Sequence, residues 1–205
     1  CEAMWARFMP CVKRIREILS SGELGEPRYI EASFCVPISW KERMALPELA
    51  GGALLDLGIY PLNYAMLYFG ETPVKITSTA ALTEKGVDEH SSFTLQYADG
   101  RIAMLGTSMT AFGGAPARIA CTKGCIICEK LLQCEEIIID NGNGVVRKEN
   151  FPFDYNGYEY EIRSVIKAIE AGKSETEETP WSTTLNELRI MDTLRAQWGV
   201  KYPFE

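Results

Sequence analysis

One stretch of this chain decides how the rest is interpreted: Gly51–Pro61, which reads GGALLDLGIYP. Asp56 and Tyr60 stand four residues apart, so a helix places them on neighbouring turns of one face, with Cβ atoms about 5–6 Å apart. A phenol can give or take a proton, and a carboxylate can orient it or bind a substrate hydroxyl. Gly51 and Gly52 let another molecule approach the backbone closely. The stretch therefore outlines an acid/base site.

The same residues also have a purely structural interpretation. Tyr60 can be a half-buried aromatic, and Asp56 can stabilise the first helical turn through the helix dipole. Pro61 has no amide hydrogen, so the helix expected from about residue 52 to 69 should break or kink near Leu57. Spacing alone does not decide between the two interpretations.

The composition is that of a soluble globular protein. The 205 residues are 46% hydrophobic and 24% charged, which is enough for a substantial core. A net charge of −7 argues against a nucleic-acid surface, and the basic cluster Lys13, Arg14 and Arg16 fits a solvated helix face. No apolar run approaches the roughly 20 residues of a membrane span, and no secretory signal is present. We therefore expect a cytoplasmic protein whose seven cysteines are reduced.

The hydrophobic pattern predicts one α+β domain: an open, mainly antiparallel β-sheet with helices packed on one face. Helices are expected over residues 8–21, 52–69, 158–171 and 182–198. Strands are expected over 28–37, 74–81, 91–97, 101–109, 117–121, 124–128 and 135–139. Asp99-Gly100 and Lys123-Gly124 predict hairpin turns, which imply antiparallel pairing. Residues 40–50 are interpreted as a polar connection and residues 141–144 as a loop.

Two other candidate sites have simpler explanations. Cys121, Cys125 and Cys128 show a C-x3-C-x2-C spacing that can hold an iron–sulfur cluster. In an extended strand, however, Cys125 and Cys128 would face opposite ways, so scattered thiols in a hairpin are the better interpretation. His90 is the sole histidine and fits a surface position at a strand end. One histidine excludes most zinc and serine-hydrolase chemistry, and no metal site is expected.

The chain lacks a recognisable nucleotide-binding motif. Neither G-x-G-x-x-G nor a Walker A pattern occurs. Gly113-Gly114 and the 141–144 loop lack the strand-then-helix context that cradles a phosphate. A dinucleotide, if the protein uses one, would bind a fold outside these 205 residues.

Five segments, in order, resemble the C-terminal domain of the Gfo/Idh/MocA oxidoreductases, closest to the dihydrodiol dehydrogenase and D-xylose dehydrogenase branch. They are residues 2–10 (EAMWARFMP), 25–28 (GEPR), 51–60, 157–162 (GYEYEI) and 198–203 (WGVKYP). The similarity extends over essentially the whole chain. It implies that residues 1–205 form a single substrate-binding and oligomerisation domain. The N-terminal Rossmann domain of the family is absent from this chain, which begins at Cys1 rather than Met.

The resemblance also implies an activity and a set of site residues. The protein would be an NAD- or NADP-dependent dehydrogenase in which hydride passes between nicotinamide and a sugar or diol. Tyr60 would exchange the proton of the substrate oxygen, with Asp56 beside it. The substrate cleft would be lined by Trp5, Arg7, Phe8 and Arg28. The missing domain would hold most of the cofactor, and the sheet face would form a homo-oligomer, commonly a dimer.

One departure from the family affects this expectation. An ordinary tyrosine titrates near pH 10 and needs a nearby cation to work at neutral pH. The family supplies the lysine of a Glu-Lys-Pro motif, which does not occur in these residues. This fragment alone is therefore expected to be inactive. The alternative is a non-catalytic sugar-binding or dimerisation module.

Overall fold

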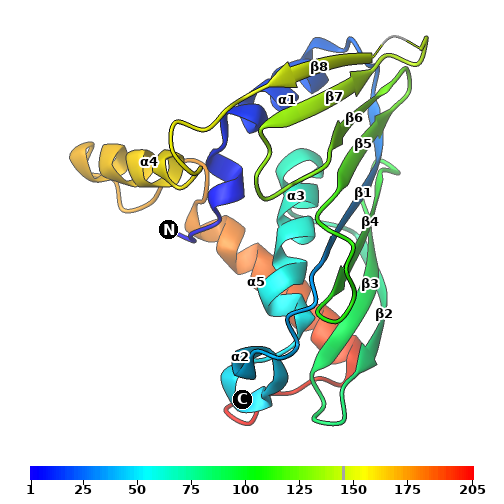
Figure 1. The fold of residues 1–205 in the computed structure, drawn as a ribbon, viewed down its shortest axis with the longest axis vertical. Helices are drawn as coiled ribbons and strands as arrows, with labels where there is room; N and C mark the ends of the chain where they lie inside the picture. The colour runs from blue at the N-terminus through cyan, green and yellow to red at the C-terminus, as the bar shows by residue number, and fades with distance from the viewer. Residues whose placement is uncertain (145) are drawn as a thin grey trace.

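The computed structural model describes residues 1–144 and 146–205. Within them, a single sheet has the strand order β2-β3-β4-β1-β5-β6-β7-β8 (Figure 1). The strands are β1 (Pro27–Cys35), β2 (Lys75–Leu82), β3 (Asp88–Gln96), β4 (Ile102–Ser108), β5 (Ala117–Cys121), β6 (Cys125–Cys128), β7 (Glu136–Asp140) and β8 (Val146–Asn150). The hairpins predicted at Asp99-Gly100 and Lys123-Gly124 are confirmed as the β3–β4 and β5–β6 connections.

The helices lie to one side of this sheet in Figure 1. They are η1 (Trp5–Phe8), α1 (Pro10–Ser21), α2 (Glu42–Ala45), η2 (Pro47–Leu49), the π-helical turn η3 (Leu54–Gly58), α3 (Ile59–Phe69), α4 (Glu159–Glu170) and α5 (Trp181–Trp198). Pro10 occupies the first turn of α1 and Gly22 ends it in a left-handed conformation, which are positions that proline and glycine favour. The fold class is confirmed. Among the described residues, no helix has both the length and the apolarity to cross a bilayer.

β1 occupies the middle of the sheet, and this placement was not predicted. It pairs in parallel with β4 on one side and antiparallel with β5 on the other. A parallel neighbour needs a long connection, which the chain provides by passing through α3 and the β2–β3 hairpin before β4. The central position places the residues of β1 next to α3 and the turn that precedes it.

The sheet also extends one strand beyond the prediction, which ended at residue 139. β8 has the sequence VRKEN, and the sequence gives no apolar alternation that would identify a strand. It pairs with β7, and ion pairs join it to α1 and β7. Arg14 Nε of α1 lies 2.7 Å from Glu149 Oε2, and Lys148 Nζ lies 2.9 Å from Glu136 Oε1 of β7. Charges on an edge strand also discourage pairing with another chain.

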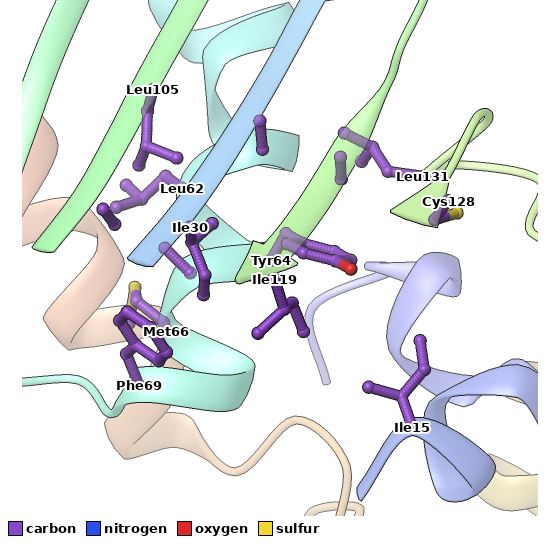
Figure 2. Packing of buried hydrophobic residues seen from close by; sticks show 14 of the residues in the cluster. Ile15, Ile30, Leu62, Tyr64, Met66, Phe69, Leu105, Ile119, Cys128 and Leu131 are labelled. Carbon is purple, nitrogen blue, oxygen red and sulfur yellow. The ribbon is translucent and has the colours of Figure 1, made fainter. Parts of the chain in front are cut away.

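The core lies between α3 and the centre of the sheet. Leu62 and Met66 of α3 are buried against Ile30 of β1 and Leu105 of β4 (Figure 2). α4 does not belong to this layer. It has no buried residue, its three isoleucines at helical spacing are exposed, and Figure 1 shows it projecting away from the sheet. The packed layer therefore places the residues around α3, and not α4, against the strands.

Candidate active site

The stretch before α3 is anchored from two sides. Asp88, at the start of β3, is fully buried, and its Oδ2 accepts the Leu54 N–H at 2.7 Å. The Tyr202 hydroxyl donates to the Gly51 carbonyl oxygen at 2.9 Å. Gly52 has a φ of 117°, and a Cβ on it would lie 2.2 Å from Asp88 Oδ1. Burial raises the pKa of Asp88 to about 7, although backbone N–H donors act in the opposite direction. β3 and the C-terminal tail thus fix where the helical segment begins.

The irregularity predicted near Leu57 is confirmed as the π-helical turn η3. The Ile59 N–H bonds to the Leu54 carbonyl oxygen, five residues back. Pro61 has no N–H to offer Leu57, so a regular α-helical ladder cannot continue through this point. A Cβ on Gly58 would lie 3.2 Å from Thr107 Cγ2 of β4, which shows how closely the turn approaches the sheet. The widened turn carries Asp56, and the first turn of α3 carries Tyr60.

Tyr60 is half-buried beside the sheet. Its ring meets the Phe34 ring of β1 edge to face, with centroids 5.7 Å apart. Burial raises the pKa of Tyr60, and hydrogen bonding from Trp5 acts in the opposite direction. The negative charges of Asp56 and Glu161 raise the pKa further. The phenol therefore holds its proton more tightly than an ordinary tyrosine does.

Asp56 lies close to Tyr60 but is paired with another residue, Arg43. The guanidinium forms a two-point pair in which Nη1 faces Oδ1 and Nη2 donates to Oδ2 at 3.1 Å, and this pair raises the pKa of Arg43. Arg43 belongs to α2, in the segment predicted as a polar connection; that segment instead holds α2 and η2. The sequence gives no spacing signal for Arg43, because 13 residues separate the partners.

A third wall of the site comes from η1 and α4. Trp5 is buried, and its ring stacks on Tyr158 with centroids 4.3 Å apart and an interplanar angle of 18°. Glu161, on the first turn of α4, has an Oε2 that is buried without a hydrogen-bond partner among the described residues, and burial raises its pKa. Sequence reasoning did not identify Tyr158, Glu161 or Phe34 as site residues. Tyr158 and Glu161 could have been found, since both lie in the segment 157–162 that carries the family resemblance.

Arg7 and Arg28, two other sequence-predicted residues, lie apart from this group. Arg7 is buried and its Nε donates to the Glu178 carbonyl oxygen at 2.6 Å. Phe8 is half-buried at the end of η1. Arg28 is exposed and paired with Glu26, and a strand rise of about 3.3 Å per residue puts it about 20 Å along β1 from Phe34. The structure thus brings Trp5, Asp56 and Tyr60 together, and leaves Arg7 and Arg28 outside the group.

One small cavity lies next to Tyr60 on the α1 side of α3. The cavity next to Tyr60, lined in part by Asn63 and Tyr64, has a volume of about 10 Å³, which is room for about one water. Gly113 and Gly114 lie between β4 and β5, with no helix after them to receive a phosphate. Over residues 1–144 and 146–205, no group of three or more His, Cys, Asp or Glu side chains could hold a metal ion.

The arrangement suits proton exchange with a hydroxylated substrate. A phenol that keeps its proton can donate it to a carbonyl oxygen, and the carboxylates of Asp56 and Glu161 can accept hydrogen bonds from hydroxyl groups. The rings of Trp5 and Phe34 add apolar walls with fixed orientation. The fold defines the class of protein: an α+β domain with an open, mainly antiparallel sheet and helices on one side.

The sequence matches the GFO/IDH/MocA C-terminal domain over residues 12–127, more than half of the chain. The chain belongs to this family.

The named relatives are longer than this chain, which matches only part of each. It is 35% identical to trans-1,2-dihydrobenzene-1,2-diol dehydrogenase of Xenopus tropicalis, over 98% of this chain and 63% of that protein. The fold also matches an aldose-aldose oxidoreductase of Caulobacter crescentus, solved with glycerol (TM-score 0.82, 22% identity, 94% of this chain and 59% of that one). An NAD binding oxidoreductase of Klebsiella pneumoniae gives a TM-score of 0.81 at 16% identity, over 95% and 63% of the two chains. At these identities, the two structures support the fold alone.

We predict that Gly52→Ala destabilises the chain by about 2–4 kcal/mol, because it adds a clash with Asp88 to the strain of a positive φ. Gly86→Ala is the matched control: its φ of 83° is also positive, but a Cβ there meets nothing within 4 Å. The control should lose only about 1 kcal/mol. Urea unfolding measures both, and equal losses would contradict the anchoring role of Asp88.

Proposed function

We propose that this chain is the C-terminal catalytic domain of an NAD- or NADP-dependent oxidoreductase acting on a sugar or diol, with Tyr60 as proton donor and acceptor. The setting of Tyr60 carries the proposal. Its phenol lies half-buried between Phe34 and Trp5, with the Asp56–Arg43 pair close by. A relative 35% identical to the chain is a diol dehydrogenase by name, which supports the same reading.

The raised pKa of Tyr60 supports a division of the site between two domains. A phenol that must also accept a proton at neutral pH needs a cation to lower its pKa. Arg43 is already paired with Asp56. The chain spans 63% of the length of the first relatives it matches. We therefore assign the cation to the lysine of a Glu-Lys-Pro motif in an N-terminal Rossmann domain, which also binds the dinucleotide. The 205 residues alone would be inactive.

Each wall of the site has a proposed role. A bound nicotinamide supplies or receives the hydride. Tyr60 moves the proton of the reacting oxygen, while Asp56 and Glu161 accept hydrogen bonds from neighbouring hydroxyls. Trp5 and Phe34 exclude water from one side of the substrate. Phe8, Arg7 and Arg28 remain sequence-based candidates for substrate contacts; Arg7 and Arg28 would reach the substrate only after rearrangement or from a second subunit.

The first test is Tyr60→Phe in the full-length protein, assayed with trans-1,2-dihydrobenzene-1,2-diol and D-xylose and with NAD⁺ and NADP⁺. We expect kcat to fall by about 10²–10⁴, since general acid–base catalysis contributes that much. Affinity for the cofactor should stay within about twofold. Tyr97→Phe is the control and should keep its kcat, because it removes a buried hydroxyl from a ring that packs against Phe69, the last residue of α3. Near-normal turnover by Tyr60→Phe would refute the role of Tyr60. Sugar binding without turnover in the wild type would favour the non-catalytic module.

We also propose that the protein forms a homo-oligomer through the outer face of the sheet. The helices leave this face uncovered (Figure 1). On it, the 46% exposed Met104 pairs in register with Glu31 of β1 and Thr94 of β3, and Ser33, Ser92 and Gly106 line the same hollow. An uncovered sheet face with an exposed methionine near small residues suits a self-complementary interface.

The seven cysteines are all unpaired among the described residues, which supports a reducing compartment such as the cytoplasm.

Met104→Glu tests the sheet-face interface. A buried charge at the centre should weaken self-association at least about tenfold, seen as a shift toward the monomer mass in light scattering over a concentration series. Val74→Glu, at a 63% exposed position just before β2, should leave the mass unchanged. A wild-type protein that is monomeric at tens of micromolar would contradict the proposal.

A further inference from the structure

A carboxylate stands where the fold calls for an apolar side chain. Glu187 of α5 is only 1% exposed and shares its helix with the buried Ile190, Met191 and Leu194. Burying a charge is unfavourable unless it is paired and hydrogen-bonded, and an apolar residue of similar size often stabilises such a position more. The contacts of Glu187 therefore indicate what the residue is for.

One contact leads to α3. Asn63 is 3% exposed, and its Nδ2 donates a hydrogen bond to Glu187 Oε1. Asn63 lies three residues after Tyr60, on the neighbouring turn of the same side of the helix. Tyr60 and Asn63 both line the small cavity described above. The carboxylate thus holds the turn of α3 that follows the phenol.

The second group that acts on Glu187 is the guanidinium of Arg7, which acts through its charge, since no hydrogen bond or ion pair within 4 Å joins the two side chains among the described residues. It is buried, and its Nη1 has no hydrogen-bond partner among the described residues. Burial lowers the pKa of Arg7, while the negative charges of Glu187 and then Glu71 act in the opposite direction. Glu71 is committed elsewhere, since Thr183 and Asn186 both donate to it. Arg7 lies two residues after Trp5 in η1, so an attraction to Glu187 acts on the segment that carries the indole.

We propose that Glu187 is a positioning residue for the Tyr60 site, holding α3 through Asn63 and η1 through the charge of Arg7. One buried carboxylate then sets both the phenol and the indole that faces it. This inference rests on the proposed function of Tyr60. It also explains why a carboxylate occupies a buried position that packing alone would give to an apolar side chain.

The charge of Glu187 should change near neutral pH. The groups that face it are Arg7 of η1, Glu2 before η1, Glu71 after α3 and the amide of Asn63. Burial raises the pKa of Glu187 to about 7, and hydrogen bonding from Asn63 and the charge of Arg7 oppose this shift. Above that pH the carboxylate attracts Arg7, and below it the attraction is lost. The position of Trp5 should follow.

The first experiment observes Trp5 directly. In ¹⁵N-labelled full-length protein, the Nε1–H resonance of Trp5, assigned with Trp5→Phe, should move with pH with a midpoint near 7. In Glu187→Gln, which keeps an oxygen for Asn63 but has no charge to titrate, the resonance should not move. Met191→Leu, an adjacent buried change, should keep the titration. A resonance that ignores pH in the wild type, or that still titrates in Glu187→Gln, would overturn the proposal.

The second experiment measures turnover. Glu187→Gln should lower kcat about tenfold, with KM and cofactor affinity within about twofold, and should remove the pH dependence near 7 that Glu187 adds to the kcat profile, leaving the contribution of Asp88. Met191→Ala, which opens a cavity in the same helix, should lose stability but keep kcat. An equal loss of kcat in Met191→Ala would show a merely structural role. An active Tyr60→Phe enzyme overturns the proposed function and this inference together, whereas an inactive one with a silent Trp5 overturns this inference alone.

Discussion

The hydrogen bond from the Leu54 N–H to the buried Asp88 carboxylate is the constraint on which the site depends. It fixes the start of the π-helical turn, while Gly52 leaves room for the carboxylate and Tyr202 holds Gly51 from the C-terminal tail. The carboxylate has backbone donors around it, and burial still raises its pKa. A turn fixed at one end and lacking the Pro61 donor at the other must widen, and the widened turn carries Asp56 beside Tyr60. The geometry of the site is therefore determined by a hydrogen bond to a side chain of β3, a strand that takes no part in the proposed chemistry.

Around that turn, the chain brings together the residues of the proposed acid/base site. Phe34 and Trp5 bury the Tyr60 phenol, and this burial is the main reason its pKa is raised. The neighbouring carboxylates raise it further, and Arg43 is held by Asp56. A tyrosine in this setting keeps its proton at neutral pH and is a weaker acid than an ordinary tyrosine, so it exchanges protons readily only when a cation lowers its pKa. In the proposed function, this domain supplies the phenol and the substrate walls, and a cation from another domain makes the proton transfer reversible.

The sequence predicted the fold well wherever local patterns determine it. Pro10, Gly22 and the two hairpin turns behave as their local chemistry dictates. The parallel pairing of β1 with β4 is a long-range choice that no local pattern records. β8 was missed because ion pairs, and not apolar alternation, hold it. In the site, spacing gave Asp56 and Tyr60, and resemblance gave Trp5. Arg43, Phe34 and Glu187 approach the site from distant parts of the chain, so only the folded structure reveals them.

The most direct test of the divided site is a titration of the Tyr60 phenol. Tyrosine labelled with ¹³C at Cζ, assigned with Tyr60→Phe, reports ionisation of each ring in an NMR pH series on the 205-residue chain. We expect the pKa of Tyr60 to lie above the ordinary value of about 10, and to fall in the full-length protein with cofactor bound. A pKa at or below about 8 in this chain alone would contradict the division, because the phenol would then need no cation from another domain.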